Sequence, residues 1–220
     1  MKILMSITLG LLVLCSAGYG ALTTVTDDFT RANADTLGSN WIDYDGRFGI
    51  RSNLCTNLGH IPPAVAEYKG LEITDEGFSV SATWREGYKD RYMGLAWNIQ
   101  DADNYYGARV TYQDYPEGNC VWSIHKYVDG AIASTLGNYD TGLDINKDRD
   151  IMMQVTGDDD GTFSVKVVVR GKSKTLTRSD SSYSGGGVGI LFDSAGASAG
   201  PLPDGAPGNA QYSYFGATEG

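Results

Sequence analysis

Apolar and aromatic residues alternate with polar ones along most of the chain, in short runs separated by turn-forming residues. The clearest run is Phe78–Trp84, in which Phe, Val, Ala and Trp take every second position and Ser or Thr the positions between. Period-two alternation is typical of a half-buried β-strand. The block from Tyr92 to Gly130 holds three such runs, divided by Asp, Asn, Gly and Pro and closed by Asp-Gly. This arrangement predicts consecutive antiparallel strands.

Strand-like runs also occur before and after this block, so the chain is predicted to be all-β. They are expected at 25–29, 48–50, 64–68, 131–136, 151–156, 162–170, 174–178, 188–192 and 211–218. Residues 193–210 are rich in Gly, Ala and Pro and are expected to form a long surface loop. Roughly eleven to fourteen short strands with turns at regular spacing, and no convincing helix, indicate an antiparallel β-sandwich.

A leader is predicted at the N-terminus. Lys2 gives a positive start, residues 3–14 are almost all apolar, and small residues follow as far as Gly20. This pattern is typical of a secretory signal peptide and is too short for a membrane span, which needs about 20 apolar residues. We therefore expect a signal peptide at 1–20, one domain at 21–220, and a protein secreted to the extracellular space or cell surface without membrane insertion.

The charge balance is acidic. The chain has 17 Lys and Arg against 27 Asp and Glu, a formal net charge of −10. Nucleic acids and anionic lipids bind basic patches, so the balance argues against both as partners. Two cysteines, Cys55 and Cys120, follow the leader, and both lie in sequence expected to form loops. Because export leads to an oxidising compartment, one disulfide between them is predicted.

Three segments carry a resemblance to a known family. They read DDFTRANADTLGSNW near the start, GLAWNIQDADNYYGARV in the middle and QYSYFGATE at the end. Together they resemble secreted bacterial members of the laminin G-like or concanavalin A-like jelly-roll superfamily, over nearly the whole mature chain. The resemblance implies a two-sheet antiparallel jelly-roll β-sandwich in which the first and last strands pair. It does not specify a function, since members include lectins, carbohydrate-binding modules, glucanases, polysaccharide lyases and adhesion domains.

The candidate binding residues lie mainly in the Tyr92–Gly130 block. If Tyr106 and Ile124 face the core, their neighbours face outward. Trp97, expected on one face with Ile99, and Trp122 are predicted to be core residues. Sugar sites combine an aromatic platform with a few planar polar groups on a rigid framework. We therefore predict glycan binding on the concave sheet by Tyr92, Asn98, Tyr105, Arg109, Gln113, His125 and Tyr127.

Catalysis and self-association compete with carbohydrate binding as functions of this chain. The Glu-x-Asp-x-x-Glu strand of jelly-roll glucanases is absent. A uronate lyase would use Arg109 to neutralise the substrate carboxylate, with His125 and Tyr127 as base and acid. However, the Gln-Ile/Val-His strand of the commonest alginate-lyase branch reads Ser-Ile-His here. The chain could also be an extracellular structural or adhesive protein that self-associates, or its outer face could be merely polar, with one exposed histidine and no ligand.

Calcium is the one cofactor that the sequence suggests. Asp158 and Asp160 lie at the tip of a predicted hairpin, where neighbouring carboxylates repel unless a cation or water screens them. The run 144–150 has oxygen side chains at alternate positions but lacks the glycine and glutamate of an EF-hand loop. Some members of the resembled family carry a structural calcium on the convex side near the chain ends, where Asp27 and Asp28 are the matching carboxylates.

Overall fold

The computed structural model describes residues 23–45, 48–58, 63–73, 77–85, 91–113, 119–144, 150–158, 160–169, 171–194 and 211–219. The predicted signal peptide and most of the predicted 193–210 loop lie outside these ranges. The described residues form strands and turns, without a helix among them. Over this part of the chain, no helix long and apolar enough to cross a membrane is found.

Fifteen strands are described. In chain order they are β1 (Thr23–Asp27), β2 (Trp41–Asp43), β3 (Phe48–Arg51), β4 (Leu54–Asn57), β5 (Ala64–Glu72), β6 (Phe78–Arg85), β7 (Arg91–Ile99), β8 (Tyr105–Gln113), β9 (Asn119–Val128), β10 (Ala131–Asp144), β11 (Asp150–Gly157), β12 (Thr162–Val169), β13 (Lys172–Ser179), β14 (Gly187–Ser194) and β15 (Gln211–Glu219). Each predicted run falls within or beside one of these strands.

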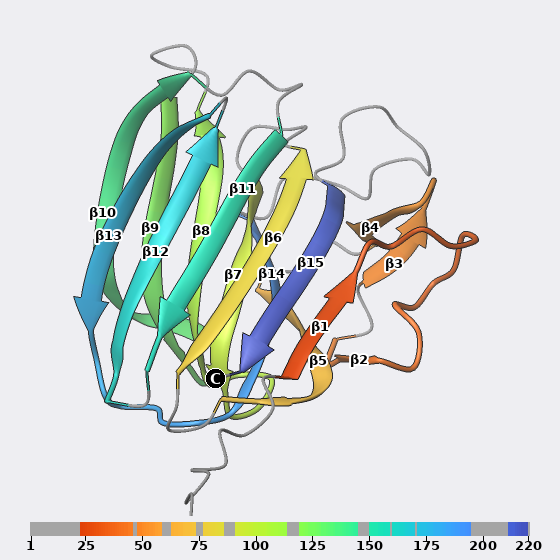
Figure 1. Ribbon diagram of the computed structural model, residues 1–220, viewed down its shortest axis with the longest axis horizontal. Coiled ribbons are helices and arrows are strands. Elements are labelled where there is room, and N and C mark those ends of the chain that lie inside the picture. The colour runs from red at the N-terminus through yellow and green to blue at the C-terminus, as the bar shows by residue number, and fades with distance from the viewer. Residues whose placement is uncertain are drawn as a thin grey trace, which may run out of the picture.

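The strands form two antiparallel sheets, one behind the other in Figure 1. The eight-stranded sheet has the order β13-β12-β11-β6-β15-β4-β3, with β1 also paired to β15. The seven-stranded sheet has the order β10-β9-β8-β7-β14-β5-β2. Strands β1 and β15 pair along their length, with Thr26 opposite Gly216. The first and last described strands therefore pair, as the family resemblance implied.

The main core lies between the two sheets. Along β12 every second residue is buried, from Phe163 to Val169, and the same alternation occurs along the neighbouring β11. Trp97 of β7 and Trp122 of β9 are fully buried in this core, which confirms their predicted placement. Burial of one large apolar side chain contributes about 1.5–3 kcal/mol, so these inward rows hold the sheets together.

A β-bulge at Asn98 changes which face the end of β7 presents. Trp97 pairs with Val188 and Ile99 pairs with Gly187, which leaves Asn98 as the extra residue; its φ is +47°. Trp97 therefore faces the main core, whereas Ile99 packs in a second cluster. The prediction that Trp97 and Ile99 share a face is wrong, because an inserted residue interrupts the alternation.

The predicted disulfide between Cys55 and Cys120 is also wrong. Cys55 lies on β4, not in a loop, and is a buried free cysteine. Cys120 lies on β9 of the other sheet. Contacts of β13 with β10 and of β15 with β5 show how the sheets superpose, and they place β4 and β9 toward opposite ends of the sandwich. Several strand spacings of about 4.8 Å separate them, beyond the span of about 4.4–6.8 Å between disulfide-bonded Cα atoms.

Candidate functional site

Most of the predicted binding residues lie on the outer face of the seven-stranded sheet, the face turned away from the main core. Strands β8 and β9 pair so that Tyr105 lies opposite Tyr127 and Arg109 opposite Ser123, with His125 between. Residues directly opposite each other share a face, so these side chains form one outer row. The residues that alternate with this row belong to the main core as far as Ile124: they are Tyr106, Ala108 and Val110 of β8, and Trp122 and Ile124 of β9. This is the alternation that the sequence predicted.

Arg109 lies between a carboxylate and an aromatic ring. Its guanidinium forms an ion pair with Asp193 of β14, and its Cζ atom is 4.1 Å from the ring centroid of Tyr92 on β7. The Tyr127 hydroxyl also donates a hydrogen bond of 3.2 Å to Asp193 Oδ2. The Arg109 and Asp193 side chains are only 14% and 7% exposed. A pair this buried is stable only because each charge has its partner in place.

Asp193 is a site residue that the sequence does not predict. It is 84 residues from Arg109 and stands at the start of the expected 193–210 loop. The structure extends β14 to Ser194 and pairs Asp193 with Tyr92 on β7. No signal in the local sequence identifies this partner, because it depends on how β14 is inserted between β7 and β5.

Two stacked tyrosines form the apolar part of this face. The ring centroids of Tyr105 and Tyr127 are 4.5 Å apart, with an interplanar angle of 18°. Both lie on the predicted outer face, but their side chains are fully buried and not exposed as expected. Burial raises the pKa of both hydroxyls. The Tyr105 hydroxyl has no hydrogen-bond partner in the described part of the chain. They pack in a second cluster with Val65, Ala96, Ile99 and Leu191.

His125 is buried as well, so the interpretation of an exposed histidine is wrong. Its side chain is held between two hydroxyls: Nε2 is 2.7 Å from Ser123 Oγ and Nδ1 is 3.1 Å from Thr135 Oγ1 on β10. Burial, assisted by the positive charge of Arg109, lowers the pKa of His125 to about 4. The imidazole is therefore neutral at pH 7, and both of its nitrogens already contact protein groups.

The remaining predicted residues are less informative. Asn98 is buried at the bulge of β7, and the side chain of Gln113 lies outside the described part of the structure. Asp158 and Asp160 both accept a hydrogen bond from the Thr162 N–H, at 3.2 and 2.9 Å, as carboxylates do when they stabilise a turn. Within the described ranges, no three His, Cys, Asp or Glu side chains gather around a metal position. Calcium at this turn stays a prediction.

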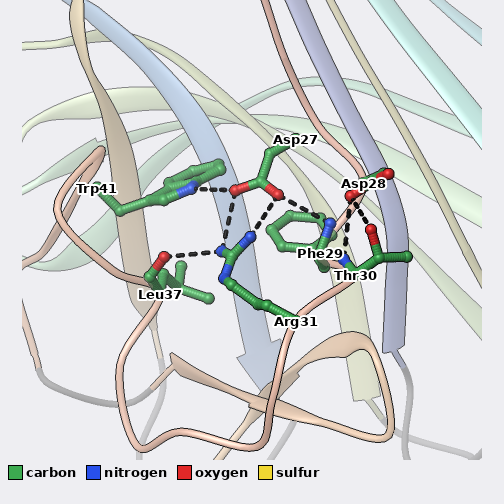
Figure 2. Close-up of polar contacts among 7 residues, drawn as sticks. All are labelled: Asp27, Asp28, Phe29, Thr30, Arg31, Leu37 and Trp41. Atoms are coloured by element: carbon green, nitrogen blue, oxygen red, sulfur yellow. Dashed lines mark hydrogen bonds and ion pairs between the residues drawn. The ribbon is translucent and has the colours of Figure 1, made fainter.

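The DDFTR segment forms a separate polar cluster beside β1 (Figure 2). Asp27 accepts hydrogen bonds from Arg31 at 2.7 and 3.0 Å, from Trp41 Nε1 at 2.8 Å and from the Phe29 N–H at 2.8 Å. Burial acts to raise the pKa of Asp27, but these hydrogen bonds together lower it below its ordinary value. N–H donors occupy both Asp27 oxygens, and Arg31 balances its charge. The calcium site that the family resemblance placed at Asp27 and Asp28 therefore does not fit this arrangement.

The topology defines the class of the molecule: it is a two-sheet antiparallel β-sandwich with a concanavalin A-like jelly-roll fold, as predicted. No protein-family model matches the chain. No curated protein matches it either.

Solved structures with the same fold are nevertheless found. A carbohydrate-binding module from Bacillus subtilis is 16% identical, covers 82% of this chain and 92% of its own, and has a TM-score of 0.52. The carbohydrate recognition domain of Emp47p is 13% identical and has a TM-score of 0.58; the match covers 90% of this chain and 95% of that domain. An inactivated mutant of β-agarase B in complex with agaro-octaose is 10% identical and has a TM-score of 0.59; the match covers 90% of this chain and 94% of the agarase chain. At these identities the likeness is one of fold.

Proposed function

We propose that this protein is a secreted, lectin-like carbohydrate-binding domain of the laminin G-like kind. It would bind glycan on the outer face of the seven-stranded sheet, which we expect to be the concave one. The observation that carries the proposal is the cluster of Tyr92, Arg109, Asp193 and Tyr127 on four different strands. Aromatic rings beside planar, hydrogen-bonding groups on a rigid sheet are what a sugar ring requires.

Two unpaired polar groups strengthen the proposal. The Tyr105 hydroxyl and the Arg109 Nε atom are buried without a hydrogen-bond partner in the described part of the chain. A buried polar group left unpaired costs about 1–3 kcal/mol. A ligand hydroxyl that reached these two groups would recover that cost. The half-buried Tyr92 ring and the Arg109 guanidinium it covers are the most accessible members of the cluster.

The names of the similar structures agree with this function: one is a carbohydrate-binding module, one a carbohydrate recognition domain and one an enzyme bound to agaro-octaose. Lys2 and the apolar run after it support the proposed secretion.

The lyase function is less compatible with the geometry. A lyase needs a cation free to neutralise the substrate carboxylate, but Arg109 is already paired with Asp193. It also needs a base near its operating pH. The pKa of His125 is about 4 because of burial and Arg109, and both ring nitrogens contact hydroxyls. Burial and Asp193 raise the pKa of Tyr127. Binding therefore accounts for this cluster better than catalysis.

A glycan array followed by isothermal titration tests the proposal. We expect Arg109→Ala to weaken binding to the glycan selected by the wild type at least tenfold, since a charge-assisted hydrogen bond contributes about 1.5–3 kcal/mol. Tyr92→Ala should also weaken this binding, because it removes the aromatic ring of the proposed site. Arg51→Ala is the matched control, because Arg51 lies on β3 of the eight-stranded sheet and pairs there with the exposed Asp35. Tyr92→Ala leaves the buried Arg109–Asp193 ion pair intact. A loss of binding in this variant therefore does not result from an unpaired buried charge. Absence of glycan binding by the wild type, or equal binding by all four proteins, would contradict the proposed site.

A further inference from the structure

The outer face of the eight-stranded sheet carries an exposed aromatic ring among small hydroxyl side chains. Tyr214 of β15 is 38% exposed. Two residues further along the same strand, Gly216 lies opposite Thr26 of β1 and Ser81 of β6. Residues two apart on a strand, and residues opposite each other, share a face. Tyr214, Gly216 and their hydroxyl neighbours therefore form one continuous outer surface.

The Tyr214 ring lies over Gly216 and not upright from the sheet. A Cβ atom built at Gly216 would be 3.0 Å from Cζ and 3.1 Å from Cε1 of Tyr214. Gly216 is consequently buried although it belongs to the outer face. The missing side chain of Gly216 leaves room for the ring to lie along the strand, with its polar end over the glycine. A flat ring with an exposed surface and a polar tip is suited to stacking against a sugar.

A pocket of about 460 Å³ opens beside this ring, lined by Thr26, Asp27, Asp28, Arg31, Asn40 and Tyr214. Its volume is within the range of small-ligand sites, about 300–1,000 Å³. Asp27 and Arg31 neutralise each other inside the wall, at 2.7 Å. Asp28 points away from that pair and toward Thr30 (Figure 2). The backbone N–H and the hydroxyl of Thr30 both donate hydrogen bonds to Oδ1 of Asp28. Asp28 and the exposed Asn40 thus supply a carboxylate and an amide at the mouth.

We propose that this pocket is a second carbohydrate site, which takes a neutral sugar ring stacked on Tyr214. The ring hydroxyls would donate to Asp28 and exchange hydrogen bonds with Asn40 and Thr26. The ligand is neutral because Asp28 is the one unbalanced charge among the lining residues; a uronate or sulfate group would be repelled by it. The site lies on the opposite side of the sandwich from Arg109, so it does not depend on the first proposal.

The experiment compares Tyr214→Ala with Tyr139→Ala. Tyr139 is the matched control, since it is also 38% exposed but lies on β10. Affinity electrophoresis in gels containing a neutral β-glucan, galactan or fructan, or an acidic alginate or pectate, measures binding to both charge classes. We expect at least a fivefold loss of affinity for a neutral polymer in Tyr214→Ala and none in Tyr139→Ala.

Two further variants make the result specific. Gly216→Ala keeps Tyr214, but the added methyl group would displace the hydroxyl end of its ring. We therefore expect a loss of affinity for the neutral polymer that is smaller than in Tyr214→Ala. Arg109→Ala removes the first proposed site: a neutral polymer still retained by Arg109→Ala and lost by Tyr214→Ala supports the second site. Equal binding by Tyr214→Ala and the wild type overturns it, as does binding confined to acidic polymers or no binding to any neutral polymer by the wild type.

Discussion

The Tyr212 hydroxyl crosses the core to reach the backbone of Gly94. Tyr212 lies on β15 of the eight-stranded sheet, yet its hydroxyl accepts a hydrogen bond of 3.0 Å from Gly94 N on β7. It also lies 2.8 Å from the Gly94 carbonyl and 2.5 Å from the Leu191 carbonyl, to which it donates its proton. A fully buried residue thus links β15 to β7 and to β14, the strand that carries Asp193.

Tyr212→Phe should therefore lower the free energy of unfolding by about 1–3 kcal/mol, because backbone groups of Gly94 and Leu191 lose a buried partner. Urea unfolding followed by tryptophan fluorescence measures the change. Tyr139→Phe is the control, since Tyr139 is exposed, and its unfolding midpoint should not move. A midpoint for Tyr212→Phe equal to that of the wild type would mean that water or neighbouring groups replace the hydroxyl.

Asp27 should make the fold sensitive to acid. Its folded-state pKa is lowered by hydrogen bonds from Arg31 and Trp41, against the opposing effect of burial. A lowered carboxyl pKa contributes stability above the unfolded value, and this contribution is lost as the pH falls below about 4. Asp27→Asn should thus be less stable than wild type by about 1–3 kcal/mol at pH 7, with a smaller difference at pH 3. Asp35→Asn, at an 84% exposed carboxylate, is the control and should change stability little.

His125 should give a second pH dependence, at higher pH. Its folded pKa of about 4 is below the unfolded value of about 6.5. Between these values the unfolded chain binds a proton that the folded chain does not, so stability falls as the pH decreases from about 6.5 to 4. The loss due to His125 is at most about 3 kcal/mol, and His125→Gln should remove it. Urea unfolding at pH 7, 5 and 4 measures the slope; an identical slope in His125→Gln would show that the ring titrates normally.

The strands and the core could be predicted from the sequence because both depend on local alternation. Phe78 to Trp84 lie on β6, with Val80 and Trp84 fully buried. Trp122 is buried, as predicted from its position two residues before Ile124 on the same strand. One inserted residue, Asn98, was enough to reverse the face of Ile99. Alternation specifies a face only as long as the pairing is regular.

The polar part of the candidate site was predicted only in part. The shared face of Arg109 and Tyr127 follows from alternation along two adjacent strands. Asp193, which pairs with both, comes from a strand inserted later in the chain, and its contact is a property of the topology. The full burial of Tyr105 has no local signal either, since burial of an outer face depends on what packs against it. Similarly, the DDFTR segment carries part of the resemblance seen in the sequence, but only the three-dimensional structure shows the hydrogen-bond donors around Asp27.

The free state of Cys55 can be tested by chemistry. Burial raises the pKa of its thiol, and a buried thiol is inert. Iodoacetamide should therefore leave Cys55 unmodified in the folded protein and alkylate it fully in about 6 M guanidinium, a strongly denaturing concentration. Peptide mapping by mass spectrometry under non-reducing conditions reads out each cysteine separately. A Cys55–Cys120 linked peptide would contradict the structure.

Tyr105→Phe should separate stability from binding. The Tyr105 hydroxyl is fully buried and has no hydrogen-bond partner in the described part of the chain, so its removal takes away a desolvated group and keeps the stacked ring. The free energy of unfolding should stay the same or rise by up to about 1 kcal/mol. If a glycan hydroxyl is the missing partner, affinity for the glycan should fall severalfold in the same variant. Tyr127→Phe is the comparison: its hydroxyl bonds Asp193, so this variant should lose stability as well. Calorimetry of both variants with and without the glycan measures the two quantities together, and a Tyr105→Phe protein that is less stable yet binds as tightly as wild type would refute a ligand role for this hydroxyl.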